Sequence, residues 1–459
     1  MTSIAIVGGG PAGYVAAITA AQLGKVVTLI DKGPLGGTCL NEGCMPTKAL
    51  LESAQVFSLV KQANKFGVDL PSDQAEVNWN IVQQRKNGIV SSLVQGIEYL
   101  MKKNKIKVIK GAASFLTNQV LLVESDGKQQ ELAADKIIIA SGSKPVSLPF
   151  APFDGNWIID SSQAMSLPSL PSSLLVIGGG VIGCEFASIY SRMGTKVTIV
   201  EMADQLLPGE DGDIASVLHT QLKKDKVKVL TSSTVKELNT VEKKATVELD
   251  GSMHDIHPDL VLVSIGRKPA VNHLGLEKVG LDFSNQGIYV NNHMQTSVPN
   301  IYACGDVIGG IQLAHVAFHE GTVAAQHACG IESHVNYHAV PRCIYTTPEI
   351  ASVGLTEKQA REQHGDIRIG EFPFSANGKA LISNERIGKV KVIIEPEYNE
   401  ILGLSIVGPH ATELIGQGTV MLHTEMTADL LENLIAAHPT LSEAIHEALL
   451  SAVSHAVHV

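Results

Sequence analysis

The sequence predicts an α/β protein with two Rossmann-like dinucleotide-binding domains followed by a C-terminal α+β domain. A glycine-rich loop between an apolar strand and a helix occurs at the start of the chain. The same strand–loop–helix unit occurs again further along, and from about residue 340 the pattern becomes β-rich and then helical. The length of 459 residues is enough for about two to four domains.

The first unit begins the chain with an apolar strand. The loop that follows contains the three glycines Gly8, Gly10 and Gly13. The first two permit a tight turn and let the backbone approach a pyrophosphate, while Gly13 lets helix and strand pack closely. A second strand ends in Asp31, whose carboxylate can accept a hydrogen bond from a ribose hydroxyl. Because strand, helix and acid are all in place, the unit predicts dinucleotide binding.

The second unit repeats this arrangement with the glycines Gly178, Gly180 and Gly183. Its second strand ends in Glu201, at the position that corresponds to Asp31. A carboxylate there binds the 2′-hydroxyl of NAD and repels the 2′-phosphate of NADP, and no arginine follows immediately to reverse that preference. The unit therefore predicts NAD, and two such units indicate that electrons pass between two dinucleotides.

A pair of cysteines lies just past the first unit. Cys39 and Cys44 are two of only six cysteines, with four residues between them. This spacing is awkward on a regular helix, but Gly43 and Pro46 can supply an irregular turn that brings the sulfurs together. Thiols paired beside a cofactor site suggest redox catalysis. Two buried cysteines that never meet would show the same spacing.

Composition excludes several classes of protein. The formal charge of −11, from 35 basic and 46 acidic residues, argues against binding to nucleic acid or to an anionic membrane surface. Apolar runs are too interrupted to cross a membrane. The first loop begins at Gly8, so we expect no leader peptide and a cytoplasmic location. The remaining cysteines show no metal-ligand spacing, so we expect small buried side chains and no metal site: Cys184, Cys304, Cys329 and Cys343.

Residues 36–48 resemble the active site of the flavin-dependent disulfide reductases with a Cys-x4-Cys centre. The resemblance extends over essentially the whole chain and is strongest to members that oxidise a protein-bound dihydrolipoyl group. It implies that Cys39 is the thiol that exchanges with substrate and that Cys44 passes electrons to the flavin. Glu42 departs from the family, which usually has an apolar residue there. A carboxylate between the thiols should disfavour a thiolate unless it points away or is paired.

The resemblance also assigns residues to two cofactors. For FAD it implies Gly8, Gly10, Gly13, Asp31, Lys48, Gly142, Asp306 and Ala314. For NAD it implies Gly178, Gly180, Gly183, Glu185, Glu201 and Gly266. Asp306 would hold the ribityl chain, and Lys48 would form an ion pair with Glu185 near the reactive edge of the flavin. In the segment that resembles the family's second flavin contact, only Ala314 is assigned to FAD, because Val316 stands where the family usually has lysine.

Two helices are expected after the cysteines, at residues 47–63 and 77–103. The second has apolar residues at three-four spacing, which indicates a packing surface. This stripe consists of Val90, Leu93, Val94, Ile97, Leu100 and Met101. In the family, helices at these positions form a hairpin, so we expect the two helices to pack against each other.

Residues 438–443 resemble the catalytic histidine block of the family. The resemblance implies that His438 is the base and that Glu443 orients it. Thr440 and Glu443 also form a capping-box pattern, so Glu443 has a structural explanation too, at the start of a helix expected over residues 443–457. Because the cysteines and His438 lie at opposite ends of the chain, the family resemblance implies a homodimer in which each chain supplies its histidine to the other.

The resemblance implies four segments and a reaction. The segments are 1–145, FAD-binding with the redox disulfide; 146–270, NAD-binding; 271–340, the second FAD-binding part; and 341–459, the interface domain. The reaction is reoxidation of dihydrolipoamide, presented by the lipoyl domain of an acyltransferase or carrier protein in a 2-oxo acid, acetoin or glycine-cleavage complex. The alternatives are a glutathione reductase-like enzyme, which Glu201 disfavours, and a non-enzymatic flavin-binding redox sensor, which would not need His438.

Overall fold

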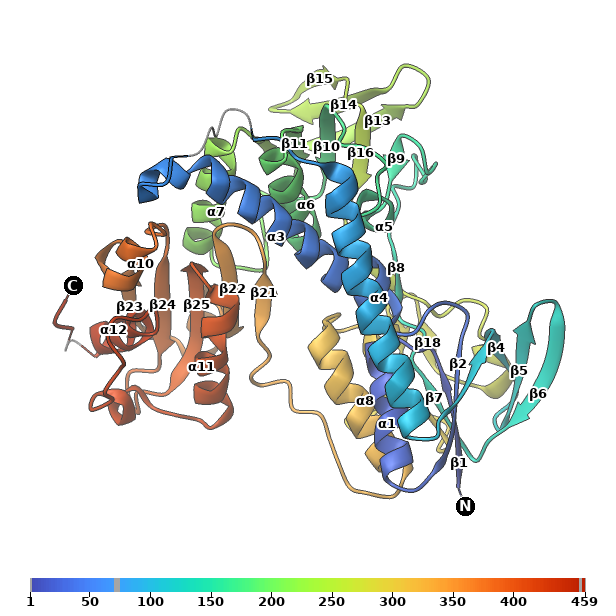
Figure 1. Ribbon diagram of the computed structural model, residues 1–459. Helices are drawn as coiled ribbons and strands as arrows, with labels where there is room; N and C mark the ends of the chain where they lie inside the picture. Colours follow the sequence, from blue (N-terminus) through green and yellow to red (C-terminus); the bar gives the residue numbers. More distant parts are fainter. Residues whose placement is uncertain (1, 70–74, 454–455, 459) are drawn as a thin grey trace.

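The computed structural model describes residues 2–69, 75–453 and 456–458. Its first sheet is parallel, with the strand order β20-β7-β1-β2-β3. The strands are β1 (Ser3–Val7), β2 (Val26–Asp31), β3 (Lys107–Lys110), β7 (Lys136–Ile139) and β20 (Ile301–Ala303). Because β20 comes from much later in the sequence, the chain leaves this domain after β7 and returns to complete it. Figure 1 shows part of the returning segment, in yellow, beside the blue N-terminal segment.

Two helices with small residues at their contact cover this sheet. They are α1 (Pro11–Gln22) and α8 (Ala314–Ala328). The alanines of α1 that face inward, Ala16 among them, are fully buried. A Cβ on Gly321 of α8 would lie 2.3 Å from the carbonyl oxygen of Ala12, so the two helices approach closely because glycine is present there. This close contact fixes the start of α8 beside the first glycine loop.

The second sheet repeats the first. It is parallel with the order β12-β11-β10-β16-β9. Its strands are β9 (Ile158–Ile159), β10 (Ser173–Ile177), β11 (Lys196–Val200), β12 (Lys228–Leu230) and β16 (Leu260–Val263). Helix α6 (Val181–Arg192) follows β10 and is 12 residues long, as α1 is. Gly8 has φ 106° and Gly178 has φ 105°, a conformation that requires glycine, so the predicted duplication is present in the backbone itself.

Short antiparallel elements connect and extend the two Rossmann units. Strand β8 (Ser143–Pro145) pairs with β17 (Arg267–Pro269) where the chain enters and leaves the second unit. One three-stranded sheet contains β4 (Ala112–Thr117), β5 (Val120–Ser125) and β6 (Lys128–Ala133). The other contains β13 (Thr234–Asn239), β14 (Lys244–Leu249) and β15 (Ser252–Ile256). The β8–β17 crossing holds the two units against each other.

The two helices after the cysteines lie against each other, as expected. They are α3 (Cys44–Lys61) and α4 (Trp79–Lys103), so α3 begins three residues earlier than predicted and α4 two residues later. The apolar stripe of α4 was expected to pack against α3, but its residues Ile97 and Met101 pack against the first Rossmann unit instead. Ile97 and Met101 are buried in the core of the first unit, while Trp79 packs in the same cluster as Leu50 of α3.

The C-terminal domain is an antiparallel sheet covered by helices. The strand order is β21-β22-β25-β24-β23. The elements are β21 (Arg342–Ile344), β22 (Glu349–Gly354), β23 (Arg368–Pro373), β24 (Lys389–Ile394), β25 (Ile401–Gly408), α11 (Ala411–His423) and α12 (Glu443–Ala452). Helix α12 ends before the predicted residue 457 because its buried face ends at Ala452; Ser454 and His455 lie outside the described residues.

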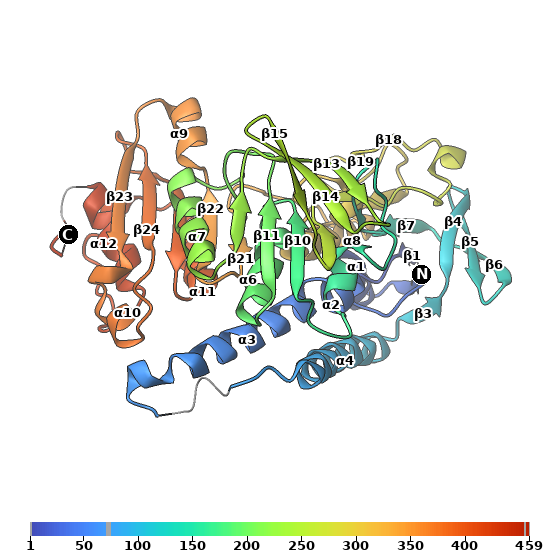
Figure 2. The same ribbon diagram turned by 90° about the horizontal axis from the view of Figure 1, so that it is seen from above.

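A buried ion cluster joins the second Rossmann unit to the C-terminal domain. Helix α7 (Gly212–Lys224) lies against β25, and Figure 2 shows the two domains side by side. Lys391 on β24 is only 2% exposed. Its ammonium lies 2.8 Å from a Glu357 oxygen and 3.2 Å from oxygens of Asp211 and Asp213. Because a buried ammonium requires such partners, this cluster fixes the position of the second unit relative to the C-terminal sheet.

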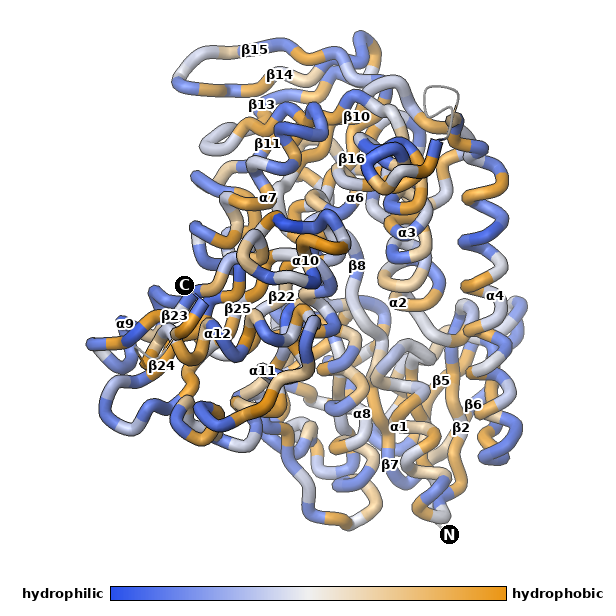
Figure 3. Tube along the Cα trace, turned by 60° about the vertical axis from the view of Figure 1, so that its left-hand side comes forward, coloured by the Kyte–Doolittle hydropathy of each residue, from blue (hydrophilic) through white to orange (hydrophobic). Residues whose placement is uncertain are grey.

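Apolar residues concentrate on the central strands, β10 and β25 among them, and polar residues on outward-facing segments (Figure 3). No helix within residues 2–69, 75–453 and 456–458 is both long enough and apolar enough to cross a membrane. The exact segment boundaries at residues 145, 270 and 340 remain predictions.

Candidate active site

A large cavity lies where the two Rossmann units and the C-terminal domain meet. Its volume is about 2310 Å³, more than twice the upper limit of about 1,000 Å³ for ordinary small-molecule pockets. It is lined by the predicted site residues Gly8, Gly10, Asp31, Cys39, Cys44, Lys48, Gly142, Gly178, Gly180, Glu185, Glu201, Gly266, Asp306 and Ala314. The structure therefore brings both glycine loops and the cysteine pair to one space.

The two cysteines meet at a break between two helices. Cys39 lies in α2 (Gly37–Glu42), and Cys44 is the first residue of α3. Gly43 separates the helices with φ −152° and ψ −112°, and a Cβ there would lie 2.9 Å from the carbonyl oxygen of Thr38. The side chains of Cys39 and Cys44 form a hydrogen bond, and no disulfide joins them in this structure. The irregular turn predicted at Gly43 is present and places the sulfurs in contact.

The two sulfurs have opposite acidities. The hydrogen bond from Cys39 lowers the pKa of Cys44 to about 7; burial opposes this shift, and the Lys48 ammonium adds to it. The same hydrogen bond, together with burial, raises the pKa of Cys39 well above its usual range. Above about pH 7 the reduced pair therefore holds one proton, on Cys39, and one negative charge, on Cys44. A thiolate with a pKa near 7 is also a good leaving group in disulfide exchange.

Lys48 makes the expected ion pair with Glu185. Its Nζ lies 2.9 Å from both carboxylate oxygens, and the Glu185 side chain is only 4% exposed. The backbone amide of Tyr345 also donates to Glu185, at 3.1 Å, and the Tyr345 ring centroid lies 4.5 Å from Nζ. The ammonium comes from α3, the carboxylate from α6, and the ring and amide of Tyr345 from the C-terminal domain. Three parts of the chain therefore fix the position of the Lys48 ammonium.

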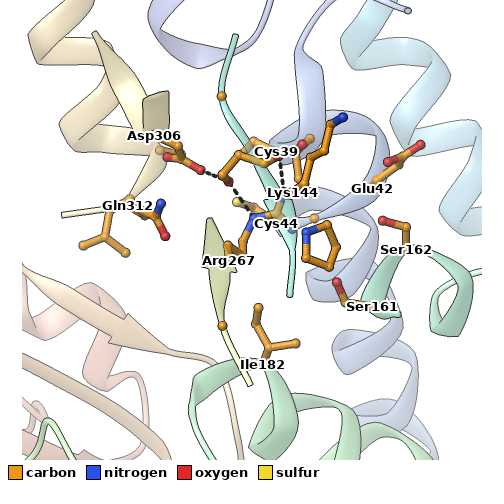
Figure 4. A pocket seen from close by; sticks show the side chains of 18 of the residues that line it. Cys39, Glu42, Cys44, Lys144, Ser161, Ser162, Ile182, Arg267, Asp306 and Gln312 are labelled. Carbon is orange, nitrogen blue, oxygen red and sulfur yellow. Dashed lines mark hydrogen bonds between the residues drawn. The ribbon is translucent and has the colours of Figure 1, made fainter. Parts of the chain in front are cut away.

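Glu42 meets one of the two conditions under which a carboxylate between the thiols leaves the thiolate possible. It is exposed at the end of α2, and in Figure 4 its carboxylate points away from the sulfur atoms. The carboxylate that raises the pKa of Cys44 is Glu185, and the cation Lys48 outweighs it. The departure from the family at Glu42 therefore leaves the thiolate intact.

The glycine loops show which glycines serve packing and which leave room for a ligand. A Cβ on Gly13 would lie 1.8 Å from the carbonyl oxygen of Gly8, and one on Gly183 would lie 2.0 Å from that of Gly178, so both are required for packing. A Cβ on Gly10 would meet only one atom, at 3.8 Å. The middle glycine of the second loop, Gly180, has nothing within 4 Å. Both middle glycines line the cavity, so their free space suits a phosphate that approaches the backbone.

The two acids after the second strands hold the loops. Asp31 accepts hydrogen bonds from the amides of Gly9 and Gly33. Glu201 accepts from the amide of Gly179 at 2.5 Å and from that of Ala203 at 2.7 Å. Each carboxylate is thus fixed at the cavity wall beside a glycine loop. Their contact with a ribose remains a prediction.

Asp306 belongs to a hydrogen-bonded chain that the sequence analysis missed. Its Oδ2 accepts from the hydroxyl of Ser143 at 2.5 Å, and Ser143 accepts in turn from Nε of Arg267 at 2.8 Å. Burial lowers the pKa of Arg267, but its charge is favoured by Asp306, by Asp160 and by Cys44. Arg267 directly follows Gly266, which the sequence analysis assigned to NAD. Its role depends on the β8–β17 pairing, which no local pattern reveals.

His438 and Glu443 form the expected pair, but far from the cysteines in sequence and outside the cavity lining that the described residues form. His438 Nδ1 lies 2.8 Å from one Glu443 oxygen, and the amide of Thr440 donates to the other at 2.7 Å. Although partial burial acts to raise the pKa of Glu443, these two contacts lower it. Glu443 therefore orients the imidazole and caps the backbone at once. Of the two hydrogen bonds in the predicted capping box, the one from the Thr440 amide to the Glu443 carboxylate is therefore present. The Thr440 hydroxyl instead donates to the carbonyl oxygen of Ala437.

Comparison with known families matches almost the whole chain. Residues 2–321 match the family described as pyridine nucleotide-disulphide oxidoreductase. Residues 340–449 match its dimerisation domain. Two dinucleotide loops that share a cavity with a cysteine pair are the features that such a family requires. The chain belongs to the pyridine nucleotide-disulphide oxidoreductase family.

Individual relatives support this assignment. A dihydrolipoyl dehydrogenase of Bacillus subtilis (strain 168) is 57% identical over 99% of this chain and 100% of its own length. One from Geobacillus stearothermophilus is 40% identical over 100% of this chain and 97% of its own. The crystal structure of LpdA from Mycobacterium tuberculosis has a TM-score of 0.90 at 29% identity, covering 98% of this chain and 99% of that one. The HOCl-induced flavoprotein disulfide reductase RclA from Escherichia coli has a TM-score of 0.86 at 30% identity, covering 97% and 99%.

The split acidity of the thiol pair gives a first testable prediction. In the reduced protein, Cys39→Ala should raise the pKa of Cys44 because it removes the hydrogen-bond donor. Cys39→Ser keeps a donor and should leave that pKa lower than in the alanine variant. The pH dependence of the alkylation rate of Cys44 by iodoacetamide measures this pKa. Equal midpoints in the two variants would contradict the assigned hydrogen bond, since serine and alanine differ only in the donor hydroxyl.

Proposed function

We propose that the protein oxidises a protein-bound dihydrolipoyl group to the lipoyl disulfide and reduces NAD⁺. The observation that carries the proposal is the Cys39–Cys44 pair, which the break at Gly43 brings together in a cavity lined by both dinucleotide loops. The 57% identity to a dihydrolipoyl dehydrogenase over both full lengths supports this substrate and acceptor. The carrier of the dihydrolipoyl group would be the lipoyl domain of an acyltransferase or carrier protein, in the cytoplasm.

Membership of the family implies FAD binding and NAD as a substrate, and the residues present fit both. For FAD we assign the first loop with Asp31, Lys48, Gly142, Asp306 and Ala314. For NAD we assign the second loop with Glu185, Glu201 and Gly266. When bound, the flavin supplies a two-electron carrier between the thiol pair and the nicotinamide. The open space at Gly10 and Gly180 and the free start of α8 at Ala314 support these assignments.

The chain's own residues account for the exchange of thiols. A substrate thiol must lose its proton to attack, and the imidazole of His438, held through Nδ1 by Glu443, can accept that proton at Nε2. The substrate sulfur forms a bond with Cys39, and the Cys39–Cys44 bond breaks with its electron pair on Cys44. The second substrate thiol then loses its proton and its sulfur displaces Cys39, which takes up one of the two protons released by the substrate; the other leaves His438 for the solvent. The products are a lipoyl disulfide, a Cys39 thiol and a Cys44 thiolate.

The match to the dimerisation domain supports a homodimer. We propose further that His438 serves the thiol pair of the partner chain. The support is its position: the imidazole is 78% exposed within one chain, and it lies outside the cavity lining where the described residues place Cys39 and Cys44. A base in that position can act on a dithiol at Cys39 only if another surface meets it.

The proposed reaction is tested by a panel of reductants. Anaerobic reduction of the flavin should be fast with dihydrolipoamide and slow with reduced glutathione or NADPH. Cys39→Ser and Cys44→Ser should each abolish turnover of dihydrolipoamide with NAD⁺ and still bind flavin, because the cysteines are part of neither glycine loop. Preferential reduction by NADPH with turnover of oxidised glutathione would favour a glutathione reductase-like enzyme. Absence of turnover with every member of the panel would favour a redox sensor.

The nicotinamide preference depends on Glu201. The variant Glu201→Ala should raise KM for NAD⁺ and narrow the ratio of kcat/KM for NAD⁺ over NADP⁺, because the carboxylate that accepts from the 2′-hydroxyl and repels a 2′-phosphate is gone. Glu201→Gln, which keeps the size but loses the charge, is the matched variant. A wild-type enzyme that used both nucleotides equally would refute the assignment.

A further inference from the structure

Three potential metal ligands lie together at a place that the proposed reaction does not use. His293, His327 and Glu332 each offer one ligand atom, and these atoms all lie within 4.8 Å of one another. His327 is in the last turn of α8, whereas the first residue of that helix, Ala314, lines the cavity. At 1.5 Å per residue, the length of the helix separates the two places by about 20 Å. The cluster is therefore a separate feature of the first Rossmann unit.

Each imidazole makes a hydrogen bond through Nδ1, and the contact of His293 is the shorter one. Nδ1 of His293 lies 2.6 Å from the carbonyl oxygen of Ser333. Because a carbonyl oxygen can only accept, this nitrogen carries the proton in the neutral ring, which leaves the lone pair on Nε2. Nδ1 of His327 lies 3.1 Å from the hydroxyl of Tyr302. Metal-bound histidines ordinarily make such a second contact, which fixes the ring and the tautomer.

Access and charge at the cluster also suit a cation. Glu332 is 80% exposed, and its carboxylate lies 3.6 Å from Nδ1 of His293, so its oxygens can move to meet an ion. The two rings are stacked, with centroids 4.6 Å apart and planes at 16°. An ion lies in the plane of each ring that binds it, so the His327 ring must turn and give up its longer contact with Tyr302, while His293 keeps its contact with Ser333. The partly exposed positions of both rings leave room for this rotation.

We propose that His293, His327 and Glu332 form a binding site for a divalent transition-metal ion, with Zn²⁺ as its representative. Two imidazoles and one carboxylate are a donor set that suits zinc and its neighbours, whereas Mg²⁺ and Ca²⁺ prefer oxygen ligands alone. The ion ties together the turn at residues 291–294, the end of α8 and the segment after it, which leads into the C-terminal domain. These ligands are scattered in the sequence, so no spacing motif predicted the site.

The test is a titration of the flavin-loaded, metal-stripped protein with Zn²⁺ by isothermal calorimetry. The Cys39–Cys44 pair is kept oxidised so that its thiols do not compete for the ion. Wild type should bind one Zn²⁺ per chain at this site, and excess Mg²⁺ should not displace it. Loss of a ligand in His293→Ala or His327→Ala should weaken binding by at least about tenfold.

Two further variants keep the test decisive. Glu332→Gln changes an exposed side chain, so it tests the site even if a histidine variant folds poorly, and it should also weaken binding. The control is His334→Ala, which removes an exposed imidazole two positions past Glu332 and should bind Zn²⁺ as wild type does. Absence of saturable Zn²⁺ binding in wild type would overturn the proposal. Binding that is unchanged in both His293→Ala and Glu332→Gln would overturn it as well.

Discussion

The hydrogen bond between Cys39 and Cys44 is the interaction on which the rest of this site depends. It gives the two sulfurs different acidities, so that Cys44 carries the charge and Cys39 the proton. That division is what a disulfide exchange needs, because one sulfur must be attacked and the other must leave. The break at Gly43 makes the contact possible, since two cysteines five positions apart on one continuous helix would point to different sides.

The surroundings of the pair explain why the protein needs three domains around one cavity. The ammonium of Lys48 favours the thiolate, and Glu185 from the second Rossmann unit holds that ammonium. Glu185 is in turn held by the amide of Tyr345 from the C-terminal domain. The ion cluster around the buried Lys391 fixes the position of the second unit relative to the C-terminal domain. The acidity of Cys44 is thus a property of the assembled chain.

Much of this architecture could be predicted from the sequence. Gly13 and Gly183 can be recognised in the sequence because close packing excludes every other residue at these positions. Asp31 and Glu201 can be recognised because each ends the second strand of its unit. Contacts between distant segments could not be predicted. Arg267 reaches Asp306 only through the β8–β17 pairing, and the stripe of α4 packs on the first sheet's core because of tertiary position. Periodicity shows that such a stripe is buried, but not what covers it.

The measurement that most directly tests the account is complementation between two inactive chains. Cys44→Ser chains and His438→Ala chains are refolded together in equal amounts, and the turnover of dihydrolipoamide with NAD⁺ is compared with that of each variant alone. If His438 serves the partner's thiols, each mixed dimer has one intact site, and random pairing restores about a quarter of the wild-type sites. Mixed dimers that form but show no activity above the separate variants would contradict the account, because His438 would then serve its own chain.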